Sequence, residues 1–126
     1  MILLDTCAVI YWTLDPEKLT RRARLAIDRA DAVALSSISV WEIGIKVARS
    51  KLRLPLPIAD FVSRLKDVRS ASIILVDEKI WLRNVELAWE HRDPADRTIV
   101  ATAMMCDCPL VTSDGNIRAF YRRSVW

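Results

Sequence analysis

Four acidic residues of the sequence combine a residue type and a position that could support chemistry. Each follows a short apolar run or opens a stretch with helical periodicity: Asp5, Glu42, Asp96 and Asp114. Only one histidine is present, and carboxylates without imidazole or thiolate partners suit hard cations such as Mg²⁺ or Mn²⁺. Such a cation can lower the pKa of a bound water and neutralise charge that develops on a phosphodiester. These acids are therefore our candidate metal ligands and catalytic groups of a metal-dependent nuclease.

Three of these acids also have an ordinary structural interpretation, which the sequence leaves open. Asp5 could cap the helix that follows it, because an N-cap side chain accepts a hydrogen bond from a first-turn amide. Ser39 and Glu42 have the spacing of a capping box. Glu42 also stands four residues before Lys46, which is the spacing of a surface ion pair on a helix. Asp114 opens an Asp-Gly-Asn stretch that favours a turn.

Asp96 is harder to explain by local structure. It stands three, four and seven residues before Ile99, Val100 and Ala103, so helical spacing places it on the stripe that this helix should bury. Burying a carboxylate costs on the order of several kcal/mol unless a cation or hydrogen bonds compensate it. The helix dipole compensates part of that cost in the first turn. A metal ion is the stronger explanation for an acid at this position.

The spacing of apolar residues predicts alternating strands and helices. The candidate strands are 1–5, 32–36, 72–77, 109–112 and a last edge strand at 124–126. The candidate helices are 6–14, 17–30, 40–50, 58–68, 78–89, one that begins after Asp93-Pro94, and a short one at 117–121, with Asp77 and Asp93 as N-caps. This order predicts an α/β fold, a three-layer α/β/α sandwich with a mainly parallel central sheet. The carboxyl ends of parallel strands share one edge, so we expect the four acids to meet there.

The composition is that of a globular protein with a single domain, residues 1–126. Hydrophobic residues make up 52% of the chain, charged residues 28%, and the formal net charge is +3. The three cysteines are an odd number in apolar or helix-end contexts, so we expect reduced thiols. The start of the chain does not have the pattern of a signal peptide, and no apolar run reaches membrane-spanning length. We expect a cytoplasmic protein without membrane segments. Most of the five tryptophans should lie in its core, and a surface that binds a partner is the alternative place for them.

Four motifs in this order resemble those of one protein family. They are Leu3-Leu4-Asp5-Thr6, Ser39-x-x-Glu42, His91-Arg92-Asp93-Pro94-Ala95-Asp96-Arg97 and Leu110-Val111-Thr112-Ser113-Asp114. The set resembles the PIN-domain ribonucleases, in particular the VapC-like toxins of type II toxin–antitoxin systems, over nearly the whole chain. Ala95 departs from the family pattern, which usually has a bulky apolar residue there, and this difference concerns packing more than catalysis.

The resemblance implies a site and a reaction. Asp5, Glu42, Asp96 and Asp114 would hold one or two Mg²⁺ or Mn²⁺ ions. The hydroxyls of Thr6 and of Thr112 or Ser113 would orient those carboxylates or a bound water. The implied activity is endonucleolytic hydrolysis of RNA by a metal-activated water.

The resemblance also implies partners. These are a cognate antitoxin, whose segment occupies a groove near the site, and a second copy of the chain in a homodimer. Our candidates for contacts with RNA phosphates are the basic residues Lys46, Arg49, Lys51 and Arg53. Their positive charge suits a polyanionic substrate.

Other classes of protein remain as alternatives. The main one is a non-catalytic α/β protein-interaction module whose acids are only helix caps and turns. A phosphatase with an aspartyl nucleophile also begins with a strand that ends in aspartate, but it needs a second acid where this chain has Cys7. A phosphorylated receiver domain is ranked lowest, because it needs an acid pair after the first strand.

Overall fold

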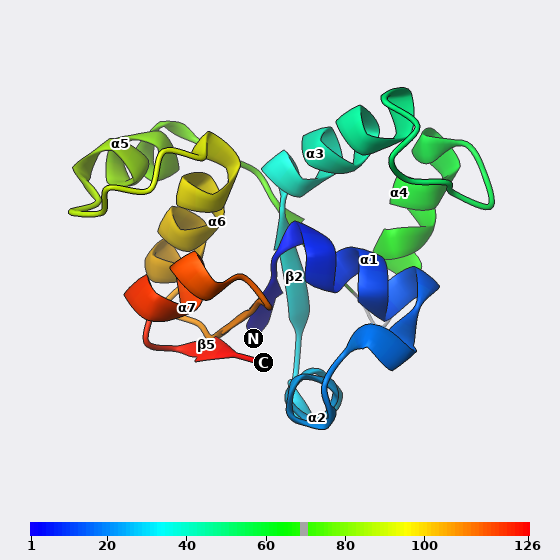
Figure 1. Cartoon of the computed structure of the whole chain (residues 1–126), viewed down its shortest axis with the longest axis horizontal. Helices are drawn as coiled ribbons and strands as arrows, with labels where there is room; N and C mark the ends of the chain where they lie inside the picture. Colours follow the sequence, from blue (N-terminus) through cyan, green and yellow to red (C-terminus); the bar gives the residue numbers. More distant parts are fainter. Residues whose placement is uncertain (69–70) are drawn as a thin grey trace.

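The computed structural model describes residues 1–68 and 71–126, and it is built around a parallel sheet (Figure 1). The five strands lie in the order β3-β2-β1-β4-β5, and every neighbouring pair is parallel. Their bounds are β1 Ile2–Leu4, β2 Val33–Ser36, β3 Ser72–Ile74, β4 Leu110–Val111 and β5 Ser124–Val125. The predicted parallel sheet is therefore confirmed, with the first strand of the chain at its centre.

Helices cover both faces of the sheet, as predicted for a three-layer sandwich (Figure 1). One group contributes to the core on the first face: α1 Thr6–Leu14, α2 Arg21–Arg29, α3 Ser37–Ala48 and α4 Ile58–Asp67. The other group contributes to the core on the second face: α5 Glu78–Glu86, α6 Pro94–Met105 and α7 Gly115–Phe120. None of the helices in the two described ranges is both long and apolar enough to cross a bilayer.

The central strand β1 is apolar throughout because it is covered from both sides. Successive side chains of a strand point to opposite faces, and here Leu4 packs into the first core while Leu3 packs into the second. Leu3 is 0% exposed and Leu4 is 1% exposed. Because β1 is buried on both faces, the strand that precedes Asp5 is held rigidly in place.

The start of α3 differs from the prediction. The helix begins at Ser37 rather than at about residue 40, and the Ser36 hydroxyl accepts a hydrogen bond from the amide of Ile38 at 3.3 Å. Ser39 therefore lies inside the helix and is fully buried. The predicted capping box of Ser39 and Glu42 is wrong, because β2 runs into α3 without a loop and the helix starts one turn earlier.

Two other helix boundaries also differ from the prediction. The stretch 17–30 is divided into a 3₁₀ turn, Pro16–Lys18, and α2, whose N-cap Thr20 accepts from the amide of Ala23. Helix α5 ends at Glu86 rather than at residue 89. In contrast, Asp77 and Asp93 cap α5 and α6 as predicted.

The burial of β1 gives a test of the fold. Changing Leu3 to Ala removes a fully buried side chain, and we expect it to lower the free energy of unfolding by about 2–5 kcal/mol. Leu25→Ala is the matched control, because Leu25 on α2 is 39% exposed. Equilibrium urea unfolding followed by circular dichroism measures both. If Leu3→Ala and Leu25→Ala lowered the free energy of unfolding equally, the result would contradict the burial of Leu3 in the core.

Candidate active site

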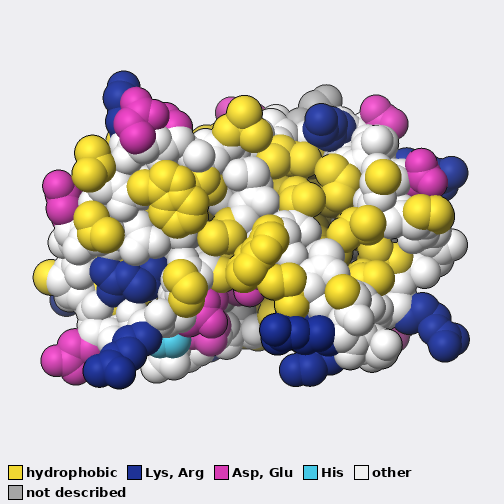
Figure 2. Space-filling view, turned by 90° about the horizontal axis from the view of Figure 1, so that it is seen from above, with side chains coloured by type: hydrophobic (Ala, Val, Ile, Leu, Met, Phe, Trp, Pro, Cys, Tyr) yellow, Lys and Arg dark blue, Asp and Glu magenta, His cyan; other side chains and the backbone are white. Residues whose placement is uncertain are grey.

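The four predicted acids lie at the carboxyl edge of the sheet because of the strand order. Asp5 follows the central strand β1, Glu42 lies on the helix that follows β2, and Asp114 follows β4. Asp96 enters from the first turn of α6, which packs against both α3 and β2. Figure 2 looks onto this edge, where acidic side chains lie beside the single histidine.

Asp5 is the most buried of the four acids, with 6% of its surface exposed. Its Oδ1 accepts a hydrogen bond from the amide of Ala8 at 2.7 Å, so it caps α1. Burial and, to a smaller extent, the charges of Asp96 and Glu42 together raise the pKa of this carboxyl to about 6, against hydrogen bonds from Thr112 and Ala8 that lower it. Asp5 is therefore both a helix cap and a member of the acidic cluster.

Glu42 is half-buried, and it is influenced by residues far from it in the sequence. Burial raises the pKa of its carboxyl, the charge of Asp96 raises it too, and a hydrogen bond from Thr6 lowers it. The Thr6 hydroxyl lies between Glu42 Oε1 and Ser39 Oγ, which is 3.0 Å away. Thr6 thus contacts a carboxylate of the candidate site, and its role in orienting that carboxylate stays a prediction. Glu42 and Lys46, both within the described ranges, do not form the ion pair that their spacing suggested.

Asp96 is half-buried at the start of α6, with 23% of its side chain exposed. Burial raises the pKa of its carboxyl, as do the charges of Asp93 and Asp114, while the hydrogen bond to His91 lowers it. His91 Nε2 lies 2.7 Å from Asp96 Oδ2. The sequence pattern does not predict a role for His91, although it is the only histidine and stands five residues before Asp96.

Thr112 connects two of the acids. Its hydroxyl accepts a hydrogen bond from the amide of Asp114 at 3.0 Å and makes a side-chain hydrogen bond to Asp5. Asp114 in turn caps α7, with Oδ1 accepting from the amide of Ile117 at 2.9 Å. Ser113, the alternative to Thr112, is exposed, and no hydrogen bond joins its hydroxyl to a carboxylate in the part of the chain that the structure describes.

The four acids are close enough to repel one another but do not form a finished ligand set. Within residues 1–68 and 71–126, no three His, Cys, Asp or Glu side chains are arranged so that they could hold a metal ion as they stand. Several of these carboxylates have one oxygen engaged by a backbone amide, a hydroxyl or His91. The metal site remains a prediction, which requires the carboxylates to move closer together.

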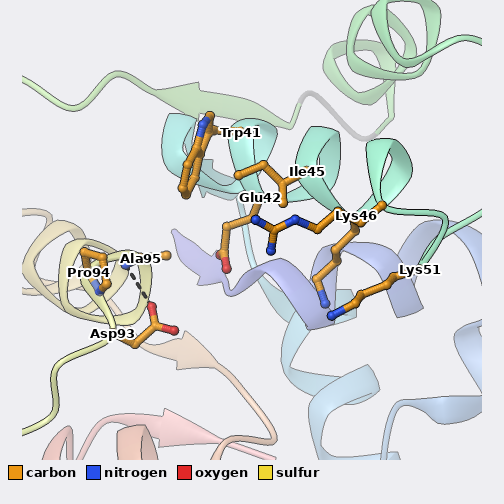
Figure 3. A pocket seen from close by; sticks show the side chains of 9 residues that line it. Trp41, Glu42, Ile45, Lys46, Lys51, Asp93, Pro94 and Ala95 are labelled. Carbon is orange, nitrogen blue, oxygen red and sulfur yellow. Dashed lines mark hydrogen bonds between the residues drawn. The ribbon is translucent and has the colours of Figure 1, made fainter.

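A groove beside the acids contains three of the four predicted basic residues. Its volume is about 380 Å³, and Glu42 and Asp93 lie at its acidic side while Lys46, Arg49 and Lys51 lie at its basic side. Figure 3 shows Glu42 pointing into the gap between α3 and the start of α6, with Lys46 and Lys51 pointing toward the same gap. Arg53 does not line this groove but a neighbouring hollow, formed mainly by the loop between α3 and α4.

The fold and the acids at its carboxyl edge define a class of protein. The model of the PIN domain family matches residues 2–123. The chain belongs to the PIN domain family, and the resemblance inferred from its motifs is confirmed.

Individual proteins are similar over nearly the whole chain. Ribonuclease VapC22 of Mycobacterium tuberculosis is 31% identical over 120 residues, which cover 94% of this chain and 90% of that protein. A toxin–antitoxin complex from Klebsiella pneumoniae has a chain with a TM-score of 0.68 and 22% identity, covering 100% of this chain and 97% of the other. FitAcB from Neisseria gonorrhoeae has a TM-score of 0.61 and 23% identity, covering 98% of this chain and 93% of the other. The two structures support the fold.

The raised pKa of Asp5 predicts how stability depends on pH in metal-free protein. Because the folded-state pKa is about 6 against an ordinary value of 3.8, the stability linked to this group is fully present below about pH 4 and is lost as pH rises through 6. We expect Asp5→Asn to be more stable than the wild type at pH 7.5, by up to roughly 3 kcal/mol. The advantage should shrink as pH falls to 4.

Urea unfolding in EDTA at pH 4, 5.5 and 7.5 measures this difference. Asp77→Asn is the matched control, because it changes an aspartate that caps α5 in the same way. Asparagine also accepts hydrogen bonds at N-caps, so capping itself should survive in both variants. If the wild type were more stable than Asp5→Asn at pH 7.5, the folded structure would not raise the pKa of Asp5 as expected.

Proposed function

We propose that this chain is an endoribonuclease that depends on Mg²⁺ or Mn²⁺ and acts as the toxin of a toxin–antitoxin pair. The observation that carries this proposal is the convergence of Asp5, Glu42, Asp96 and Asp114 on one edge of a PIN domain. The similarity to a protein named Ribonuclease VapC22 supports RNA as the substrate. The similarity of fold to a chain in a toxin–antitoxin complex supports an antitoxin partner.

The donor set fits a hard divalent cation. The four acids offer only oxygen ligands, which Mg²⁺ and Mn²⁺ prefer. The burial and mutual repulsion that raise the pKa of Asp5, Glu42 and Asp96 would be offset by a positive ion among them. When bound, such an ion supplies a water of lowered pKa and neutralises charge on the phosphodiester.

Other residues of the chain orient the carboxylates and bind the RNA. Thr6 orients Glu42, and Thr112 orients Asp5 and the backbone of Asp114. Lys46, Arg49 and Lys51 bind the phosphates of RNA on either side of the scissile bond, because they line the groove that Glu42 enters. Arg53 extends this positive surface outside the groove.

RNA cleavage tests the proposal directly. The purified, antitoxin-free protein is incubated with a mixed cellular RNA pool, with Mg²⁺ or Mn²⁺ and then with excess EDTA. We expect discrete fragments that disappear with EDTA and whose rate of formation falls by at least about 100-fold in Asp5→Asn, because a metal ligand is lost. Asp77→Asn, the cap on α5, should cleave like the wild type.

A second measurement separates the enzyme from a non-catalytic interaction module. Mn²⁺ binding is measured by calorimetry in the wild type and in Asp96→Asn. Binding that weakens in the variant supports the metal site even if the RNA pool lacks the target. Folded wild-type protein that neither binds Mn²⁺ nor cleaves RNA would favour a module whose acids serve only as caps and turns.

We also propose that the chain forms a homodimer through an apolar face beside the site. Ile38, Val76 and Pro94 line a hollow of about 450 Å³ together with two tryptophans. Trp41 is 59% exposed and Trp81 is 48% exposed, and Figure 2 shows apolar side chains spread over this edge. A two-fold interface needs a surface that is complementary to itself. A hollow bordered by protruding aromatic side chains meets that need, since the protruding side chain of each copy can enter the hollow of the other.

The second partner, the antitoxin, is proposed to place a segment in the groove near the acids and so exclude RNA. The groove joins the apolar hollow through Trp41 and Pro94, which line both.

The cysteines Cys7, Cys106 and Cys108 are free thiols. This supports a reducing compartment, the cytoplasm, as the place where the pair acts.

The mass in solution tests the dimer. The chain has a mass of 14.4 kDa, and we expect sedimentation equilibrium to give twice this value. Trp81→Glu should yield the monomer, because it places a charge in the apolar hollow. Leu25→Glu introduces the same charge on α2, away from the hollow, and should leave the dimer intact. If the Trp81→Glu protein stayed dimeric, the apolar hollow would not be the dimer interface.

A further inference from the structure

His91 is held in a fixed place beside Asp96, although it lies in a segment without regular structure. Its ring centroid is 4.7 Å from that of Trp89, at an interplanar angle of 32°. Trp89 in turn stacks on Phe120 of α7, with centroids 4.7 Å apart and planes 7° from parallel. Only 21% of the His91 side chain is exposed. The imidazole is therefore the outer member of a stack of three aromatic rings.

The backbone around His91 is fixed by the residue next to Asp96. The Arg97 guanidinium donates hydrogen bonds to the carbonyl oxygens of Trp89 and His91, and to those of Asn84 and Leu87. The contact with the His91 carbonyl is 3.1 Å long. A guanidinium that holds several carbonyls keeps a fixed orientation itself. Helix α6 thus carries both Asp96 and the side chain that places His91 against it.

The contact between His91 and Asp96 has a defined chemical direction. An ionised carboxylate only accepts hydrogen bonds, so when Asp96 is ionised the proton in the 2.7 Å contact lies on His91 Nε2. The bond engages Oδ2 of Asp96 and fixes the rotation of the carboxylate about its last torsion. Among the described residues, no hydrogen bond engages Oδ1.

We propose that His91 is a positioning residue for cation binding: it donates from Nε2 to Asp96 Oδ2 and so presents Oδ1 to the other acids. This inference rests on the proposed metal-dependent function. Partners that orient ligands in this way typically account for 10–100-fold in metal affinity. A purely structural role is the alternative, in which the ring only completes the stack on Trp89 and Phe120.

Two substitutions separate these roles. His91→Phe keeps an aromatic ring on Trp89 but removes the donor, whereas His91→Gln removes the ring and keeps an N–H at a similar distance from the backbone. Mn²⁺ affinity is measured by calorimetry without RNA, alongside the melting temperature of each variant. We expect His91→Phe to weaken Mn²⁺ binding about 10–100-fold and His91→Gln to stay within about threefold of the wild type.

RNA cleavage gives a second readout. In His91→Phe the rate should reach the wild-type plateau, but only at a Mn²⁺ concentration raised in proportion to the lost affinity. Unchanged Mn²⁺ affinity in His91→Phe would overturn the inference, and so would equal weakening in both variants. A wild type that binds no Mn²⁺ would overturn the proposed function itself, so the two failures are distinct.

A measurement on the wild type covers the case in which a variant does not fold. Proton and ¹⁵N NMR of the imidazole should show a protected Nε2–H in the metal-free protein, and this signal should persist when Mg²⁺ is added. Loss of the protected proton on Mg²⁺ binding would mean that Asp96 leaves His91 to bind the ion. That result also overturns the inference.

Discussion

The repulsion between carboxylates at one edge of the sheet is the constraint on which the rest of the structure depends. Asp5 is nearly buried, and the charges of Asp96 and Glu42 add to the cost of that burial. A fold can tolerate such a cluster only if each member is compensated by hydrogen bonds or by helix N-termini. The described hydroxyls, amides and imidazole around these acids supply that compensation, and they also fix where the carboxylates lie.

A helix-capping role and a role in the candidate site do not exclude each other for these acids. Asp5 and Asp114 each cap a helix with one oxygen, and both belong to the acidic cluster. A capping bond engages one acceptor position of a carboxylate that has several. The same side chain can therefore start a helix and contribute a ligand. In this chain two helix-capping carboxylates, Asp5 and Asp114, thus also belong to the candidate site.

Much of the fold and the convergence of the four acids at one edge of the sheet could be predicted from the sequence, for a physical reason. The strands are short apolar runs, and the acids Asp5 and Asp114 directly follow two of them, so parallel pairing alone brings them together. The roles of His91 and Arg97 could not be predicted, because both act through contacts in an aperiodic loop. The predicted start of α3 is wrong because three serines, Ser36, Ser37 and Ser39, are all suitable N-caps, and the pattern does not show which of them ends β2.

The acids come from both sides of the sheet, and this has a mechanical consequence. Asp5 and Glu42 belong to helices that contribute to the first core, whereas Asp96 and Asp114 belong to helices of the second. An ion shared among them would act as a cross-link between the outer layers of the sandwich, much as a disulfide joins two segments. The loaded site would then oppose any sliding of one helical layer past the other, and the two cores would unfold as a single cooperative unit.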